Sequence, residues 1–359
     1  MLESFSKSLQ TKIDLLKKRQ KPIVIGDVCF KSNLILAPLS AICSSPYRLL
    51  MENLGAGGTV SELISCHGIN YQNEKTLEML KIHEREESVG IQLFGEDQQA
   101  MAKAIKIVET YNPKFIDINM GCPVRKVVTK GGGSALLRDI NKLDQFFTTI
   151  KKSTDIPVSI KIRTGWDESS LNADQVTQIA ANCGIEFVAI HGRTRTQQYK
   201  GAADWDYIEQ VAIKSPLPII GNGDLHSSIK IKERLNITNC TALMLGRGPL
   251  RNPFIFLETL IKEDDDIIFT PRDHFEVIEK FLLYMKQSIS RERVLFIQLR
   301  KHVVWIAAGY PGASKFRDDL FKHKTVEEIL KTSEQFFCSL ENISKQINSH
   351  ASFMTGGHG

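Results

Sequence analysis

Short apolar runs alternate along most of the chain with longer segments of helical length. Eight runs of five to eight residues are rich in Val, Ile and Leu, as expected of parallel strands that are buried on both faces. The predicted strands are Leu34–Pro38, Thr59–Ser65, Val89–Gly95, Phe115–Gly121, Val158–Gly165, Phe187–Gly192, Pro218–Gly223 and Ala242–Gly248. The predicted helices between them include Asp97–Tyr111, Ala135–Ser153, Asn172–Cys183 and Ser227–Leu235. Eight such β-α units predict an α/β fold, a TIM (β/α)8 barrel.

Glycine spacing and the ends of the runs favour this barrel over an open, doubly wound sheet. An open sheet that binds dinucleotides carries GxGxxG after its first strand, and Gly55-Ala56-Gly57-Gly58 does not have that spacing. Almost every run is followed on its C-terminal side by residues able to do chemistry. Because these ends converge on one mouth of a barrel, we expect the active site there.

The alternation of strands and helices stops at residues 263–273. This segment contains the acidic run Glu263-Asp264-Asp265-Asp266 and Pro271, so it is predicted to be a linker. Beyond it, apolar residues recur at helical spacing, which predicts a small all-α helical bundle over residues 274–350. The barrel is assigned to residues 21–262, a basic N-terminal extension to residues 1–20, and a disordered tail to residues 351–359.

Composition changes this interpretation little. The chain has 46 Lys and Arg against 41 Asp and Glu, a net charge of +5, which permits a polyanionic partner without establishing one. The seven cysteines never form CxxC, which indicates reduced cytosolic thiols and predicts neither disulfides nor a metal site. No apolar run reaches the ~20 residues of a membrane span, so we expect a cytoplasmic protein. The N-terminal extension is interpreted as a solvated amphipathic helix or, alternatively, as an RNA-binding element.

Several motifs, in the same order along the chain, resemble those of the bacterial dihydrouridine synthases. The most specific is Asp117-Ile118-Asn119-Met120-Gly121-Cys122-Pro123, followed by Gly131-Gly132-Gly133-Ser134. Further similar segments are Ala37-Pro38-Leu39, Lys161-Ile162-Arg163-Thr164-Gly165-Trp166, His191-Gly192-Arg193-Thr194-Arg195, Gly221-Asn222-Gly223-Asp224 and Leu245-Gly246-Arg247-Gly248. In the predicted bundle, Arg300-Lys301-His302-Val303-Val304-Trp305 is similar to the DusB-like branch of that family.

The resemblance implies a tRNA-dihydrouridine synthase with tightly bound FMN, NADPH as reductant and a uridine of tRNA as substrate. Hydride transfer to carbon 6 of uracil leaves an enolate, which must be protonated at carbon 5 by a general acid. Cys122 is predicted to be that acid, because a thiol of ordinary pKa is mostly protonated at pH 7. The alternative is that Cys122 is a small buried apolar residue.

Two residues are predicted at the flavin ring. Lys161 lies in an apolar strand, where an unpaired ammonium is costly to bury, so it needs an anionic partner. The resemblance places Lys161 and Gln92 at the pyrimidine edge of the flavin, and a structural salt bridge is the alternative for Lys161.

The FMN phosphate is predicted to bind at the ends of the last two barrel strands, where barrels commonly bind phosphate. His191 is expected nearby, lining the phosphate or the flavin, with a core role as the alternative. The remaining residues of the predicted cofactor site are Pro38, Leu39, Ser40, Asn222, Gly223, Asp224, Gly246 and Arg247.

RNA contacts are predicted in two places. Asn119 matches the family position that contacts substrate and cofactor. Arg125, Lys126 and Lys130 lie beside Cys122 on a glycine-rich loop that is expected to close over RNA or, alternatively, to be merely solvated. In the bundle, residues 286–301 contain five basic residues and one acidic residue, 5 − 1 = +4, and this predicted RNA footprint includes Arg300 and Lys301.

Two other functions remain as alternatives. An FMN barrel oxidoreductase of a small-molecule pyrimidine would share the phosphate turns and Lys161 but would not need a basic helical domain. An RNA-binding protein without flavin chemistry would not need Cys122, Lys161, Asn222 and Arg247 together. We therefore expect an enzyme that works as a monomer on tRNA.

Overall fold

A closed parallel barrel forms the larger part of the protein. The computed structural model describes residues 4–340, 343 and 345. The barrel strands are β3 (Leu34–Leu36), β4 (Gly58–Val60), β5 (Ile64–Ser65), β6 (Val89–Phe94), β7 (Phe115–Met120), β8 (Val158–Arg163), β9 (Phe187–His191), β10 (Ile219–Asn222) and β11 (Ala242–Leu245). They follow the order β4-β3-β11-β10-β9-β8-β7-β6-β5, and the sheet closes where β4 also pairs with β6. This confirms the predicted TIM barrel, with the second predicted strand divided into β4 and β5.

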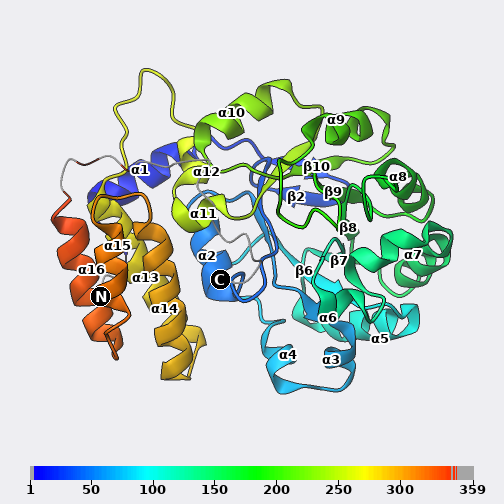
Figure 1. The fold of residues 1–359 in the computed structure, drawn as a ribbon, viewed down its shortest axis with the longest axis horizontal. Helices are drawn as coiled ribbons and strands as arrows, with labels where there is room; N and C mark the ends of the chain where they lie inside the picture. The colour runs from blue at the N-terminus through cyan, green and yellow to red at the C-terminus, as the bar shows by residue number, and fades with distance from the viewer. Residues whose placement is uncertain (1–3, 341–342, 344, 346–359) are drawn as a thin grey trace.

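Helices surround the barrel (Figure 1). The longer ones are α2 (Ser45–Asn53), α5 (Gln98–Val108), α7 (Leu143–Lys151), α8 (Ala173–Asn182), α9 (Trp205–Lys214) and α10 (Ser228–Ile237). The short ones are α3 (Cys66–Asn70), α4 (Glu74–Glu78), α6 (Arg125–Val128), α11 (Gly248–Arg251) and α12 (Ile255–Glu258), with 3-10 turns at Glu109–Tyr111, Gly133–Arg138 and Ile140–Lys142. Helix α5 shows why they pack: Met101, Ala104, Ile105 and Val108 share one face and are buried.

The inside of the barrel changes from apolar at one end to polar at the other. In β7, Ile116, Ile118 and Met120 pack toward the helices, whereas alternate residues face the interior. At the N-terminal end, the interior ring of Phe115 packs edge-to-face against those of Phe30 and Phe187. Further along the strands the interior residues are polar, among them Gln92, Asn119 and Lys161. The open end of the barrel therefore lies at the C-terminal ends of the strands.

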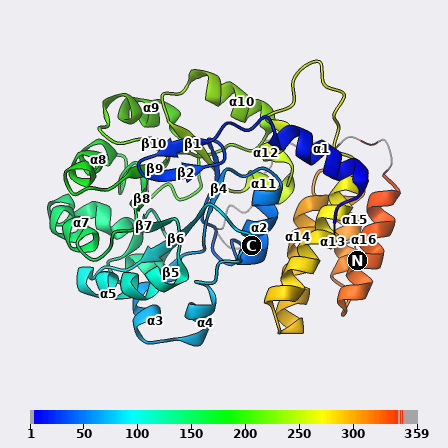
Figure 2. The same ribbon diagram turned by 180° about the vertical axis from the view of Figure 1, so that it is seen from behind.

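An antiparallel hairpin that the sequence did not predict covers the apolar end (Figure 2). It consists of β1 (Ile23–Ile25) and β2 (Val28–Phe30), which pair Ile25 with Val28 across a two-residue turn. Gly26 in this turn has φ 58°, a conformation that favours glycine. Ile25, Val28 and Phe30 join the core at this end of the barrel.

The C-terminal part forms the expected helical bundle beside the barrel (Figure 1). Its helices are α13 (Pro271–Ser288), α14 (Glu292–Ala307), α15 (Ala313–Leu320) and α16 (Val326–Cys338). Helix α13 packs against α2, and α14 packs against α11. Pro271 starts α13 rather than ending a linker, because Thr270 caps the helix in a capping box with Asp273.

The N-terminal segment is not the solvated helix that we expected. Helix α1 (Lys7–Lys17) lies across the bundle and the barrel in both views, and its residues Leu9, Ile13 and Leu16 are buried (Figures 1 and 2). Nζ of Lys12 pairs with Asp273 at 2.8 Å, and Arg19 pairs with Asp265. These two cations therefore neutralise acidic residues of the protein itself. The predicted tail 351–359 lies outside the described residues.

In the described part of the chain, no helix is both long and apolar enough to cross a membrane.

Candidate active site

A pocket opens at the polar end of the barrel. The sequence predicted thirteen residues for catalysis, cofactor binding or uracil contact, and all thirteen line this pocket. The residues assigned to the RNA loop and the bundle do not line it. The thirteen are Pro38, Leu39, Ser40, Gln92, Asn119, Cys122, Lys161, His191, Asn222, Gly223, Asp224, Gly246 and Arg247. Arg163 and Tyr199 also line it and were not assigned a role from the sequence. The pocket has an empty volume of about 1190 Å³, including space open to solvent at its mouth.

Cys122 lies on the loop after β7, and its backbone is held on both sides. Its N–H donates to Oδ1 of Asn119 at 2.9 Å, and its carbonyl accepts from the hydroxyl of Ser134 at 2.9 Å. Burial raises the pKa of the Cys122 thiol above its ordinary value, against smaller opposite effects from the Val124 backbone and Arg163. The thiol is therefore protonated at neutral pH.

Lys161 points from β8 into the pocket, where its partner is an amide rather than a carboxylate. Nζ of Lys161 donates to Oδ1 of Asn222 at 3.0 Å, and Nδ2 of Asn222 donates to the Met244 carbonyl at 2.7 Å. Burial, assisted by Arg163, lowers the pKa of Lys161 to about 8, although Asp117 opposes this effect. Among the described residues, no carboxylate lies within ion-pair distance of Lys161. This agrees poorly with the alternative of a structural salt bridge.

Arg163 faces the pocket two residues further along β8. Its Nε donates to the Gly121 carbonyl at 2.7 Å, and its Nη1 donates to the carbonyls of Thr194 and Gln198 at 2.9 and 2.8 Å. It thereby joins the Cys122 loop to the loop after β9, which also carries Tyr199. Because strand residues alternate, the inward position of Lys161 was a signal in the sequence that could have found Arg163. Tyr199 has no such signal.

The corner near β9, β10 and β11 is rich in cations. The carboxylate of Asp224 lies among them, where it accepts from Nη2 of Arg193 at 2.8 Å and lies 3.6 Å from Nη2 of Arg247. Although burial opposes it, hydrogen bonds from His226 and Arg193 hold the pKa of Asp224 well below its usual value. Burial and then the cations Arg163, Lys161 and Arg193 hold the pKa of His191 well below its usual value, so His191 is neutral.

Two glycines let the backbone approach this corner closely. Gly223 has φ 140°, and a Cβ there would lie 2.5 Å from the Cβ of Ala203. At Gly246, by contrast, a Cβ would meet nothing nearer than Ala37 and Leu39 at 3.9 Å, so it would occupy open pocket space. The absence of a Cβ therefore lets Ala203 pack against Gly223, whereas at Gly246 it leaves room in the pocket against the backbone after β11.

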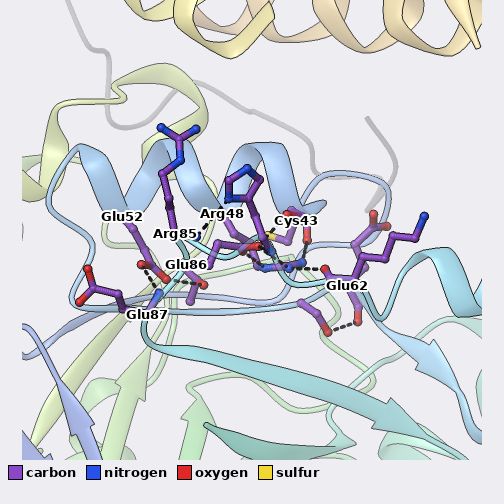
Figure 3. Close-up of polar contacts among 12 residues, drawn as sticks. Cys43, Arg48, Glu52, Glu62, Arg85, Glu86 and Glu87 are labelled. Carbon is purple, nitrogen blue, oxygen red and sulfur yellow. Dashed lines mark hydrogen bonds and ion pairs between the residues drawn. The ribbon is translucent and has the colours of Figure 1, made fainter. Parts of the chain in front are cut away.

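The loop after β3, which supplies Pro38, Leu39 and Ser40, is held by side chains from α2 and from the segment after β4 (Figure 3). The fully buried Arg48 donates from Nε to Glu86 at 2.7 Å and from Nη1 to the Cys43 carbonyl at 3.0 Å. Ala41, at φ 59°, donates its N–H to the Glu62 carboxylate. Arg48 on α2 and Glu62 between β4 and β5 thus hold this wall of the pocket in place.

Comparison with known proteins identifies the family. The family model for dihydrouridine synthase matches residues 35–344. The tRNA-dihydrouridine synthase B of Pasteurella multocida is 38% identical over 317 residues, 87% of this chain and 95% of that protein. The probable tRNA-dihydrouridine synthase of Rickettsia prowazekii is 34% identical over 337 residues, 90% of this chain and 100% of that protein. The chain belongs to the dihydrouridine synthase family.

Membership of this family confirms the resemblance seen in the motifs, including the DusB-like branch. The activity predicted from the sequence, reduction of uridine in tRNA by a flavin-dependent oxidoreductase, is the activity of this family. Among solved structures, histamine dehydrogenase from Rhizobium sp. 4-9 has a TM-score of 0.53 at 12% identity, over 76% of this chain and 51% of that chain. That likeness concerns the fold alone.

The other residues predicted to touch RNA lie outside the pocket. Arg125, Lys126 and Lys130 follow Cys122 on and after α6, and all three are exposed. In α14, the guanidinium of Arg300 lies over the rings of Phe296 and Phe321, at 5.0 and 4.7 Å.

Lys301, also on α14, is only partly exposed. Its Nζ lies 5.3 Å from the ring centre of Trp305.

The described residues contain no cluster of three or more His, Cys, Asp or Glu side chains able to hold a metal ion.

Proposed function

We propose that the protein is a tRNA-dihydrouridine synthase that uses FMN and NADPH to reduce the carbon 5–carbon 6 double bond of a uridine in tRNA. The observation that carries this proposal is a protonated, backbone-anchored Cys122 in the same pocket as a group of cations with few carboxylates to neutralise them. Membership of the dihydrouridine synthase family supports the reaction, and it disfavours a small-molecule pyrimidine as the substrate.

The residues present fit FMN. Lys161 supplies an ammonium without a carboxylate partner, as an anionic ring edge requires. Arg247 and the open backbone at Gly246 supply the cation and the close approach that a phosphate needs. The side chain of Asp224 is engaged by Arg193, so Asp224 serves this site by orienting cations and by its backbone.

The chain's part in the chemistry is to orient the ring and deliver one proton. When bound, reduced FMN would supply the hydride for carbon 6 of the uracil. Cys122 then transfers its thiol proton to carbon 5 of the resulting enolate, which completes the saturated carbon–carbon bond, and the thiolate is reprotonated from solvent. Lys161 stabilises negative charge on the neighbouring ring edge, and Arg163 keeps the Cys122 loop in place.

RNA is proposed to bind across the mouth of the barrel and the helical bundle. The exposed cations Arg125, Lys126 and Lys130 border the pocket, and the basic side of α14 lies on the bundle. The target uridine has to leave its stack to reach the pocket, which costs a few kcal/mol in RNA. We also propose that the enzyme is a cytoplasmic monomer, with the barrel and the bundle as two domains that pack against each other through a shared apolar core.

Two half-reactions test this function. The purified protein should contain FMN, and NADPH should reduce that FMN faster than NADH does. Addition of uridine-containing tRNA under anaerobic conditions should reoxidise the flavin and yield one dihydrouridine per flavin oxidised. Reoxidation by a free pyrimidine but not by tRNA would contradict the proposal and favour the small-molecule oxidoreductase.

A further inference from the structure

A chain of buried hydrogen bonds runs from the middle of the barrel to the Cys122 loop. The Ser159 hydroxyl donates to Oδ1 of Asp117 at 2.7 Å, and Nε2 of Gln92 donates to Oδ2 of Asp117 at 2.6 Å. Nδ2 of Asn119 donates to Oε1 of Gln92 at 2.9 Å. Oδ1 of Asn119 accepts the N–H of Cys122 at 2.9 Å. Strand register produces this chain, because Gln92, Asp117 and Ser159 are neighbours across β6, β7 and β8.

The two ends of the chain determine the direction of every bond in it. A backbone N–H can only donate, so the atom of Asn119 that meets Cys122 and Gly121 must be its oxygen. The NH₂ group of Asn119 therefore faces Gln92, and the oxygen of Gln92 faces Asn119. The NH₂ group of Gln92 is then left facing Asp117, where it needs an acceptor. A carboxylate at position 117 provides that acceptor.

Each of the two amides keeps a second N–H for the pocket. Gln92 and Asn119 both line the pocket, and no acceptor for their second N–H occurs among the described residues. Turning the Gln92 amide over would set its NH₂ group against that of Asn119. Turning the Asn119 amide over would leave the Cys122 N–H without its acceptor. The two side chains can therefore reverse only together, at the expense of the Cys122 anchor.

We propose that Asp117 is a positioning residue that orients the amides of Gln92 and Asn119, so that both direct an N–H into the pocket while Asn119 anchors the Cys122 loop. This inference rests on the proposed function, since it concerns the ligand that lies between these amides and Cys122. The ring edge that meets them must carry hydrogen-bond acceptors, such as a carbonyl oxygen or an unprotonated ring nitrogen.

The location of Asp117 agrees with this role. Asp117 is only 2% exposed, and it does not line the pocket. Burial raises the pKa of Asp117 to about 6, against the opposing hydrogen bonds from Gln92 and Ser159 and the charge of Lys161. Asp117 is thus ionised, and able to accept both bonds, in the neutral range.

Three substitutions at one position separate acceptor geometry from charge. Asp117→Asn keeps an oxygen that can accept from Gln92, while its NH₂ group can donate to the Ser159 hydroxyl. Asp117→Leu keeps the bulk but removes every acceptor. Asp117→Ala, which serves if the leucine variant does not fold, admits water that can accept or donate and so fixes no orientation. Ser159→Ala is the matched control, because it removes an equally buried polar group and leaves Asp117 able to accept from Gln92.

The first readout is amide hydrogen exchange at residues 119–122 in protein stripped of flavin. Exchange should become about tenfold faster in the Leu and Ala variants, as expected for the loss of one hydrogen bond, and should change little in Asp117→Asn and Ser159→Ala. The second readout compares the rates of the two half-reactions, flavin reduction by NADPH and flavin reoxidation by RNA. RNA-dependent reoxidation should slow by roughly 10- to 100-fold in the Leu and Ala variants while flavin reduction by NADPH persists, because small misplacements affect the chemical step most.

Two results would overturn the proposal. One is wild-type exchange at residues 119–122 in the Leu and Ala variants. The other is an Asn variant as impaired as the Leu variant, which would make charge rather than orientation decisive. If the wild-type enzyme itself is not reoxidised by RNA, the proposed function fails, whereas the exchange measurement still decides the role of Asp117.

Discussion

Cys122 combines a raised pKa with a backbone that is fixed from both sides, and this pair of properties suits a proton donor. Replacement by Ala should leave NADPH-driven flavin reduction near normal, since Cys122 has no part in that step. RNA-dependent reoxidation should slow by ~10²–10⁴-fold, the usual contribution of a general acid. Stopped-flow absorbance of the flavin measures both rates. Equal slowing of both half-reactions would show that the cysteine has only a structural role.

Lys161 gives the cofactor site a pH dependence whose direction follows from its pKa. The side chain is cationic below its pKa of about 8 and neutral above it. If its ammonium donates to the acceptor atoms of the flavin's pyrimidine edge, FMN affinity should be constant up to pH 7 and should fall as the pH rises through 8. One pH unit above the pKa, the dissociation constant should be about tenfold higher.

Fluorescence titration of the flavin-free protein with FMN measures this dependence. Lys161→Met is the control, because it should bind FMN more weakly and show no change in affinity between pH 7 and pH 9. A wild-type affinity that is flat over this range would remove Lys161 from the cofactor site.

At the scale of the elements, the buried pair of Arg48 and Glu86 should stabilise the fold around α2 (Figure 3). Their side chains are 1% and 0% exposed. Removing one partner leaves a buried charge, so Arg48→Met or Glu86→Gln should lower the free energy of unfolding by about 3–5 kcal/mol. The double variant Arg48→Met with Glu86→Gln should lose less than the sum of the two single changes.

Urea denaturation of the flavin-free protein provides the measurement. The exposed pair of Lys142 and Asp139 is the control, with side chains 83% and 46% exposed. Lys142→Met should change the free energy of unfolding by only about 0–1 kcal/mol. A loss that small for Arg48→Met would contradict the structural role of the buried pair.

The sequence predicted the barrel well because each strand is a buried apolar run. Every predicted run contains or overlaps a strand. The hairpin at Ile23–Phe30 was missed because its strands have three residues each, too few to show a period. Pro271 was interpreted as a breaker although proline suits the first turn of a helix, which is where it lies in α13.

The pocket was predictable for a related reason. The C-terminal strand ends of a barrel converge, so residues just after each apolar run had to meet, and all thirteen line the pocket. What the sequence could not supply is side-chain pairing across strands. The bond between Gln92 and Asp117 depends on strand register, and Tyr199 reaches the pocket through a loop without any periodic pattern.

At the scale of the whole molecule, the N-terminal helix and the bundle form one continuous apolar core with a side of the barrel. This core contains Leu9 and Ile13 of α1, Leu50 of α2 and Phe281 of α13. The backbone N–H of Ser6 also donates to Glu276 at 2.8 Å. Helix α1 therefore joins the two predicted domains, and its role is at least partly structural.

RNA capture should depend most on the basic residues of α14 that remain exposed. Arg293 and Arg291, which occupies the N-cap position just before α14, are exposed, whereas Arg300 and Lys301 are partly buried against aromatic rings. Replacing Arg291 and Arg293 by Ala should lower the slope of log affinity against log salt by roughly 0.7–0.9 for each RNA phosphate that these side chains neutralise. The Arg300 and Lys301 double variant should lower it less. Lys103→Ala on α5 is the exposed control. Fluorescence anisotropy with labelled tRNA measures the slopes, and equal slopes for all four proteins, wild type included, would remove α14 from the RNA footprint.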